Sequence, residues 1–181
     1  MNKEPYLQFR KDGTFRILHI TDLQESIYPR KDTIRLLCAL LNNTRPDLVI
    51  MTGDQLKGYS PWFRLAGKSG VQNTIERRRI PYAVTFGNHD IQCGISNEEQ
   101  ADLYRQQLYG ICPEEGAAAG TFDLTVHRYD GSEALRFYLI DSGNITAHGQ
   151  YAPPSDEVLD WLRGRLAGEK LPSMLFQHIP L

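Results

Sequence analysis

The sequence predicts a layered α/β domain, in which helices pack against sheets that contain parallel strands. Short apolar runs typical of strands alternate with segments whose apolar residues recur at helical spacing. A hairpin pattern interrupts this alternation in the second half of the chain. The resulting order, β-α-β-α-β, then a hairpin, then α-β, is typical of a layered α/β architecture.

The first predicted elements are a hairpin and a helix. Asp12-Gly13 lies between two extended runs, and this predicts a tight turn that pairs residues 7–9 with residues 15–20. Asp32 is the predicted N-cap of a helix that runs through Leu41.

A buried strand and a second strand are predicted next, with a loop and a short helix between them. Residues 48–51 are wholly apolar, which is typical of a parallel strand covered on both faces. Residues 55–70 are rich in Gly, Ser and Lys and predict a loop, in which Trp62 is a candidate pocket residue. A short helix at 71–79 then leads into a strand at 82–86.

The second half of the chain predicts a helix, a hairpin, another helix and a last strand. Residues 98–108 have a helical pattern, and residues 122–127 and 135–140 form the predicted hairpin. Ser155 is the predicted N-cap of the last helix, and residues 174–177 form the final strand.

Composition describes an ordinary globular chain and excludes several classes of function. The 181 residues, 41% hydrophobic and 23% charged, predict one domain that spans residues 1–181. A net charge of −2 gives no nucleic-acid signature, and no apolar run approaches the length of a membrane span. Because the sequence shows no signal peptide and its three cysteines lack metal-ligand spacing, we expect a cytoplasmic protein with free thiols.

Four polar clusters each follow a predicted apolar strand. They are Thr21-Asp22-Leu23-Gln24, Gly53-Asp54, Gly87-Asn88-His89-Asp90 and Gln177-His178-Ile179-Pro180. Functional groups gather at the carboxyl ends of the strands in such sheets, so we expect the clusters to converge. Hard divalent ions prefer carboxylate and amide oxygens, and imidazole suits zinc, iron and manganese. The clusters therefore predict part of a two-metal site at one rim of the sheet.

Each cluster taken singly has a simpler explanation. An aspartate after a strand is more often a turn or helix-cap residue than a metal ligand, and Gly53-Asp54 alone is a common turn. His178 alone fits a packed histidine at a strand end, and a structural role is favoured for Asp90 over orientation of His89. The repetition at successive strand ends is what favours a metal site.

The ordered set resembles the motifs of the calcineurin-like metallophosphoesterases, which run D-x-H, G-D, G-N-H-[D/E], a lone H and G-H-x-H. The resemblance extends from Phe15 to Leu181, and residues 137–143, Trp161 and residues 176–181 are similar to a branch related to purple acid phosphatases. It implies an α/β/β/α sandwich that is incomplete at its C-terminal end. It also implies a metal-dependent phosphoesterase that hydrolyses small phosphate esters at a dinuclear site by attack of a metal-activated water.

The resemblance implies a role for each matching residue. Asp22 would bind the first metal, Asp54 would bridge both metals, and Asn88 and His178 would bind the second. His89 would lie near the leaving-group oxygen, where an imidazolium donates a proton or stabilises charge. Asn88 and His89 would thus also contact the substrate. The implied cofactors are two divalent ions, drawn from manganese, iron, zinc and magnesium.

Two departures from the family pattern bear on activity. Gln24 stands where the family has histidine, and its amide oxygen either binds a hard cation, which favours manganese or magnesium, or leaves the ligand set. The chain ends at Leu181 without a G-H-x-H, so the resemblance implies that the final strands and last ligands are absent from this sequence. An incomplete sheet has an unpaired edge, which we expect to favour self-association.

Three functions remain open from the sequence. The first is a phosphoesterase that acts on a phosphomonoester, a phosphodiester or a nucleotide. The alternative is a catalytically inactive or truncated family member that serves as a phosphate-binding or interaction module. The third is a single-metal site that binds phosphate without efficient turnover. Gln24 and the missing C-terminal histidines favour the alternative, whereas Asp54, Asn88 and His89 oppose it.

Overall fold

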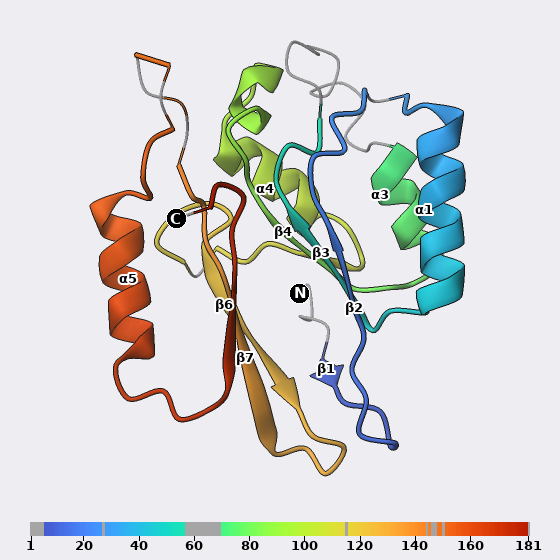
Figure 1. Cartoon of the computed structure of the whole chain (residues 1–181), viewed down its shortest axis with the longest axis vertical. Coiled ribbons are helices and arrows are strands. Elements are labelled where there is room, and N and C mark those ends of the chain that lie inside the picture. The colour runs from blue at the N-terminus through green and yellow to red at the C-terminus, as the bar shows by residue number, and fades with distance from the viewer. Residues whose placement is uncertain are drawn as a thin grey trace.

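The described part of the chain forms two four-stranded sheets packed face to face, with helices outside them (Figure 1). The computed structural model describes residues 6–26, 28–56, 70–114, 116–143, 145, 148–149 and 151–180. The predicted α/β/β/α sandwich is confirmed. The predicted loop around Trp62 lies outside the described residues.

One sheet is entirely parallel, and three of the four polar clusters follow its strands. Its order is β2 (Ile17–Ile20), β3 (Leu48–Thr52), β4 (Tyr82–Thr85) and β5 (Gly110–Ile111). Every residue of β3 and β4 is buried, as the apolar run in β3 predicts. Helices α1 (Lys31–Thr44) and α3 (Gly70–Glu76) lie on its outer side (Figure 1). Between β4 and β5, α4 (Asn97–Arg105) packs Tyr104 against the ring of Tyr82.

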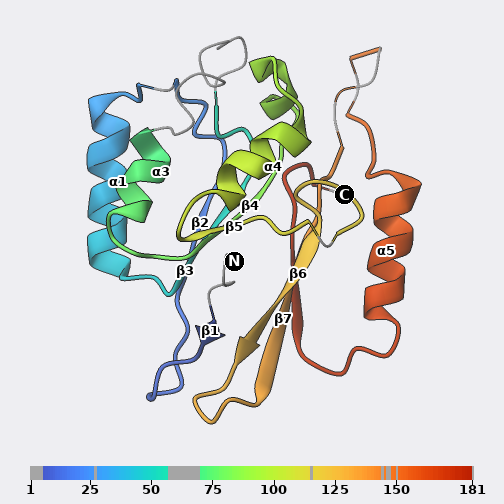
Figure 2. The same cartoon turned by 180° about the vertical axis from the view of Figure 1, so that it is seen from behind.

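The second sheet combines parallel and antiparallel pairs. Its order is β1 (Leu7–Gln8), β6 (Phe122–His127), β7 (Glu133–Leu139) and β8 (Ser173–Phe176). Strands β6 and β7 form the predicted hairpin, which is confirmed, and β8 runs parallel to β7. Helix α5 (Asp156–Leu166) connects β7 to β8 and lies outside this sheet, where Trp161 packs edge-on against Tyr138 (Figure 2).

The hydrophobic core lies between the two sheets. Phe137 of β7 is fully buried, with ring centroids 6.2 Å from Phe15 and 5.6 Å from Phe176. These contacts join the segment before β2 to β7 and β8, so one core holds both sheets together.

The predicted hairpin between residues 7–9 and 15–20 is wrong, although the turn between them forms. The backbone N–H of Arg10 donates to Thr14 O at 2.8 Å, and Gly13 N–H donates to Arg10 O at 2.9 Å. Beyond the turn, however, β1 pairs with β6 and β2 pairs with β3. The two strands separate because each finds a longer-range partner in a different sheet, which a local turn pattern cannot reveal.

The predicted start of the first helix is also wrong. The N-cap position is Arg30, and Asp32 lies within the first turn, paired with Arg35. The buried carboxylate of Glu25 accepts the backbone N–H of Arg30 at 3.0 Å and the hydroxyl of Thr33. The carboxylate of Glu25, five residues before the N-cap position, therefore holds the start of the helix. The prediction that Ser155 caps the last helix is confirmed, since its side chain accepts the N–H of Val158.

The three cysteines are free, as predicted. Cys93 and Cys112 are buried, and burial raises the pKa of both thiols to about 12. These two thiols are therefore protonated at neutral pH and poor nucleophiles.

Strand β8 lies at one edge of its sheet and exposes apolar side chains. Met174 and Leu175 are 47% and 42% exposed. Self-association through this edge stays a prediction. None of the described helices is long and apolar enough to cross a membrane.

Candidate metal centre

The loops that follow β2, β3, β4 and β8 meet at one rim of the sandwich. They carry Asp22, Asp54, Asn88 and His178. Asp22, Asp54 and His178 each offer one donor atom, and these three atoms lie within 4.8 Å of one another. Three of the predicted ligands, on segments far apart in the sequence, are thus brought together.

Asp54 lies at the centre of this group and is 1% exposed. Its Oδ1 accepts the backbone N–H of His89 at 2.9 Å, and its Oδ2 lies 3.5 Å from His178 Nε2 and 4.0 Å from His89 Nε2. Burial alone would raise the pKa of the Asp54 carboxyl, but hydrogen bonds from His178 and from the His89 backbone lower it below its usual value. The carboxylate is therefore ionised at neutral pH.

His178 is held with one defined ring nitrogen facing Asp54. Its Nδ1 lies 2.9 Å from the carbonyl oxygen of Thr52, and a carbonyl can only accept, so Nδ1 carries a proton. In the imidazolium form Nε2 donates to Asp54 Oδ2, 3.5 Å away, and in the neutral ring Nε2 offers a lone pair at the same position. A hydrogen bond to Asp54 raises the pKa of His178, and burial works against that rise. A backbone partner of this kind is how metal-binding histidines are commonly oriented.

The loops that carry the acidic residues have unusual backbone conformations. Asp22 (φ 54°), Gln24 (φ 43°) and Asp54 (φ 52°) all lie in the left-handed region. Backbone bonds join the two loops, from Asp22 N–H to Gly53 O at 3.2 Å and from Gln24 N–H to Asp54 O at 2.9 Å. Left-handed non-glycine residues cluster at functional sites, where the surrounding structure imposes them.

Two glycines allow the loops after β3 and β4 to touch. A Cβ atom on Gly53, whose φ is +102°, would lie 2.3 Å from the backbone nitrogen of Gly87. A Cβ atom on Gly87 would lie 2.4 Å from Asp54 Oδ1 and 2.8 Å from a ring carbon of His178. The glycines that precede Asp54 and Asn88 are therefore required by close packing at the site.

Asp90 holds these two loops together through its carboxylate. Oδ2 accepts the backbone N–H of Asp54 and of Gly87, both at 2.8 Å, and Oδ1 accepts that of Gln55 at 3.1 Å. Burial raises the pKa of Asp90 to about 6, while the hydrogen bonds from Gly87 and Asp54 oppose the rise. The group is thus mostly ionised at neutral pH, and its bonds are those of a structural residue.

The ring of His89 is positioned by a residue that the sequence analysis missed. His89 Nδ1 lies 2.9 Å from Gln92 Oε1, which leaves Nε2 on the side of Asp54. Gln92 belongs to the short 3-10 helix η1 (Asp90–Cys93) that follows His89. The sequence signal for this contact is the spacing of three residues between His89 and Gln92, because one turn of 3-10 helix brings residues at this spacing together.

Gln24 and Asn88 lie beside this group. The Nε2 of Gln24 donates to Asp54 Oδ2 at 3.3 Å, so its amide reaches the carboxylate of the site. Asn88 is 5% exposed and stands between Gly87 and His89, both of which adjoin Asp54.

The arrangement suits a divalent cation. Asp22 and Asp54 offer carboxylate oxygens, and His178 offers Nε2 of an imidazole whose other nitrogen is held by a backbone carbonyl. Oxygen donors with imidazole match manganese, iron, zinc and magnesium to different degrees.

Comparisons with known proteins identify a matching family and similar chains. The family model described as "Calcineurin-like phosphoesterase" matches residues 15–181. An uncharacterized protein of Schizosaccharomyces pombe, C1020.05, is 28% identical over 148 residues, which cover 78% of this chain and 28% of that protein. "Probable inactive purple acid phosphatase 29" of Arabidopsis thaliana is 23% identical over 188 residues, 87% of this chain and 46% of that protein. The chain therefore spans less than half the length of these two relatives.

A solved structure shares the fold. A dimetal phosphatase from Danio rerio superposes with a TM-score of 0.59 and 13% sequence identity, over 92% of this chain and 70% of its own. At this level of identity the likeness supports the fold.

We expect Gly53→Ala to destabilise the protein far more than Gly13→Ala. Both glycines have positive φ, but a Cβ at Gly13 meets nothing within 4 Å, whereas one at Gly53 meets the backbone of Gly87. The left-handed strain is shared, and the clash at Gly53 adds about 1–3 kcal/mol. Urea unfolding of the two variants measures the difference, and equal losses would show that the loops are not in close contact.

We expect Asp90→Asn to lower the free energy of unfolding by about 1–3 kcal/mol, because an amide NH₂ replaces one acceptor that faces backbone N–H groups. Asp130→Asn is the control, since Asp130 accepts from Ser132 in an exposed turn. Chemical denaturation measures both. An unchanged unfolding free energy for Asp90→Asn would contradict the role of this carboxylate.

Proposed function

The chain belongs to the calcineurin-like phosphoesterase family, and from this premise we propose that it hydrolyses phosphate esters with the help of divalent metal ions. The observation that carries the proposal is the group of donor atoms from Asp22, Asp54 and His178 within 4.8 Å of one another. The imidazole of His89 lies beside the same carboxylate. Metal ligands and a proton donor at one rim are what such hydrolysis needs.

In the proposed site, Asp22 would hold the first ion, Asp54 would contact both, and Asn88 and His178 would hold the second. Gln24 is a further candidate ligand, because its amide already reaches Asp54. The ions are divalent and drawn from manganese, iron, zinc and magnesium, and Gln24 in place of an imidazole favours manganese or magnesium. When bound, they would activate a water molecule and offset the charge of the phosphate.

The protein's own groups act on the substrate and on its leaving group. Gln92 fixes the His89 ring at Nδ1, so Nε2 is the atom that donates a proton or a hydrogen bond to the leaving oxygen. The backbone N–H of His89 also donates to Asp54 Oδ1. The position of His89, the proposed proton donor, is therefore linked to that of Asp54, the proposed metal ligand. His89 and Asn88 would contact the phosphate. The substrate is a small phosphate ester: a monoester, a diester or a nucleotide.

A second candidate function is a phosphate-binding or interaction module without turnover. The observation that favours it is the contact of Gln24 with Asp54 where a histidine is typical of the family. A plant relative carries a name that describes it as inactive. Turnover by the chain distinguishes the two functions.

We expect manganese-dependent hydrolysis of mono- or bis-(p-nitrophenyl) phosphate, and loss of nearly all of it in Asp54→Asn. The same variant should lose most bound metal, measured by mass spectrometry of the purified protein, because one carboxylate oxygen becomes an amide nitrogen. Asp32→Asn, an exposed aspartate on α1, is the matched control.

Two outcomes would count against these assignments. Full metal content in Asp54→Asn would show that Asp54 does not bridge the ions. A folded, metal-loaded chain without turnover would reject the phosphatase proposal and favour the binding module.

We expect His89→Ala to keep its metal and to lower kcat by about 10²- to 10⁴-fold, because a proton donor is removed without a ligand. His127→Ala is the control, since His127 stacks on Tyr6. Parallel metal analysis and steady-state kinetics check both variants. Loss of metal in His89→Ala would instead identify His89 as a ligand.

A further inference from the structure

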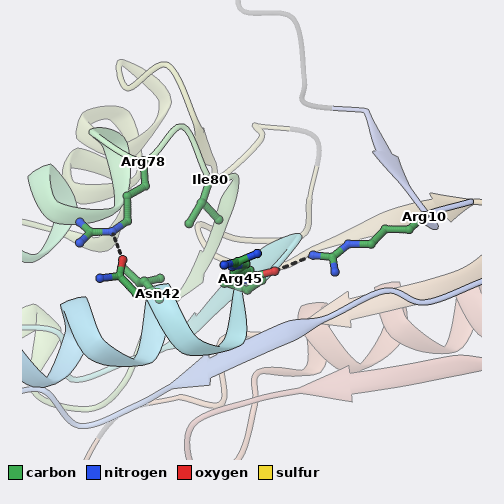
Figure 3. A pocket seen from close by; sticks show the side chains of 7 residues that line it. Arg10, Asn42, Arg45, Arg78 and Ile80 are labelled. Carbon is green, nitrogen blue, oxygen red and sulfur yellow. Dashed lines mark hydrogen bonds between the residues drawn. The ribbon is translucent and has the colours of Figure 1, made fainter. Parts of the chain in front are cut away.

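Three arginines line an open pocket of about 520 Å³ near the amino ends of the strands of the parallel sheet (Figure 3). Arg10 follows β1, Arg45 follows α1, and Arg78 lies between α3 and β4. Apolar walls are supplied by Leu41, Pro46 and Ile80. We call this site the arginine pocket. Its volume is within the range of small-molecule sites.

The arginine pocket and the metal centre occupy opposite ends of the same strands. Pro46 lies just before β3 and Ile80 just before β4, whereas Asp54 and Asn88 follow the carboxyl ends of these strands. The five residues of β3 alone extend about 16 Å. A ligand in the arginine pocket would therefore not touch the metal ligands.

The positive charge of the pocket is only partly balanced. Arg10 pairs with Asp47 at 2.9 Å. Among the described residues, Arg45 and Arg78 form no ion pair, and the partners of Arg78 are the neutral side-chain oxygen of Asn42 at 3.4 Å and the carbonyl of Thr74 at 2.8 Å. Three guanidinium groups and one carboxylate leave an excess of positive charge, although the whole chain has a net charge of −2. Such a concentration of arginines favours an anion.

Capping of helix α1 explains only part of this cluster. Arg10 Nη2 donates to the carbonyl of Arg45 at 2.6 Å, and Arg16 Nη1 donates to that of Thr44 at 3.2 Å. These two side chains therefore serve the carbonyls at the end of the helix. Among the described residues, the guanidinium of Arg45 has no such partner, and Arg78 turns towards Asn42 at the rim of the pocket (Figure 3).

We propose that the arginine pocket binds an organic phosphate, with its phosphate group between Arg45 and Arg78 and its organic part against Leu41, Pro46 and Ile80. Guanidinium groups bind phosphate oxygens through paired hydrogen bonds, and their flat faces stack on planar rings. The apolar walls next to the charges favour a ligand with a ring or a short carbon skeleton over a bare inorganic ion. This proposal does not depend on the proposed catalytic function.

Calorimetric titration of the 181-residue chain with adenosine monophosphate, in the presence of a metal chelator, tests the proposal. The chelator removes phosphate binding at metal ions and prevents hydrolysis. We expect saturable binding that weakens at high ionic strength, and binding roughly tenfold or more weaker in Arg45→Gln and in Arg78→Gln, because each loses a charge-assisted contact. Inorganic phosphate should bind more weakly than adenosine monophosphate.

Arg35→Gln is the matched control, since Arg35 is an exposed arginine on α1 that pairs with Asp32. It should bind like the unmodified chain. Circular dichroism checks that each variant is folded. If Arg45→Gln does not fold, the affinity of Arg78→Gln for adenosine monophosphate tests the proposal by itself. No binding, unchanged binding in Arg78→Gln, or an equal loss in Arg35→Gln would overturn the proposal. Equal affinity for inorganic phosphate would overturn its organic part.

Discussion

The carboxylate of Asp90 is the interaction on which the rim of the sandwich depends. It accepts three backbone N–H groups, from Asp54, Gln55 and Gly87, and thereby joins the loop after β3 to the loop after β4. This places Asp54 in the left-handed region and brings Gly53 against Gly87. Burial raises the pKa of Asp90 to about 6. Without these N–H donors, an ionised carboxylate at this buried position would be unfavourable. The position of the central ligand thus follows from a residue that binds neither metal nor substrate in the proposed site.

Much of the fold and part of the site could be predicted from the sequence, because both follow from strand ends. The wholly apolar β3 signalled a strand covered on both faces, and parallel strands bring the residues that follow them to one rim. The pairing of β1 was not predictable, because the local turn at Gly13 forms whether or not the flanking strands pair. The support of His89 by Gln92 depends on a single turn of 3-10 helix, which has no strong pattern in the sequence.

The parallel sheet separates opposite charges between its two ends. Asp22 and Asp54 lie beyond the carboxyl ends of the strands, whereas Arg10, Arg45 and Arg78 surround their amino ends. The composition of the chain does not reveal this separation of charge, because the three arginines come from separate segments and the net charge is only −2. The pairing of β2, β3 and β4 assembles both groups, so the same topology that builds the candidate metal centre also builds the arginine pocket.

Gln24 illustrates how one substitution changes the options of a site without changing its shape. Its amide nitrogen donates to Asp54, which stabilises the carboxylate by a hydrogen bond. Rotation of the terminal amide by half a turn exchanges nitrogen for oxygen at the same position, and the oxygen is a ligand for a hard cation. A histidine in place of Gln24 would offer only ring nitrogens, which suit softer ions better than an amide oxygen does. The left-handed backbone of Gln24 and its bond to Asp54 O keep the side chain at the rim in either orientation. In the proposed site, the kind of ion bound would therefore depend on which atom Gln24 presents, within one and the same arrangement of loops.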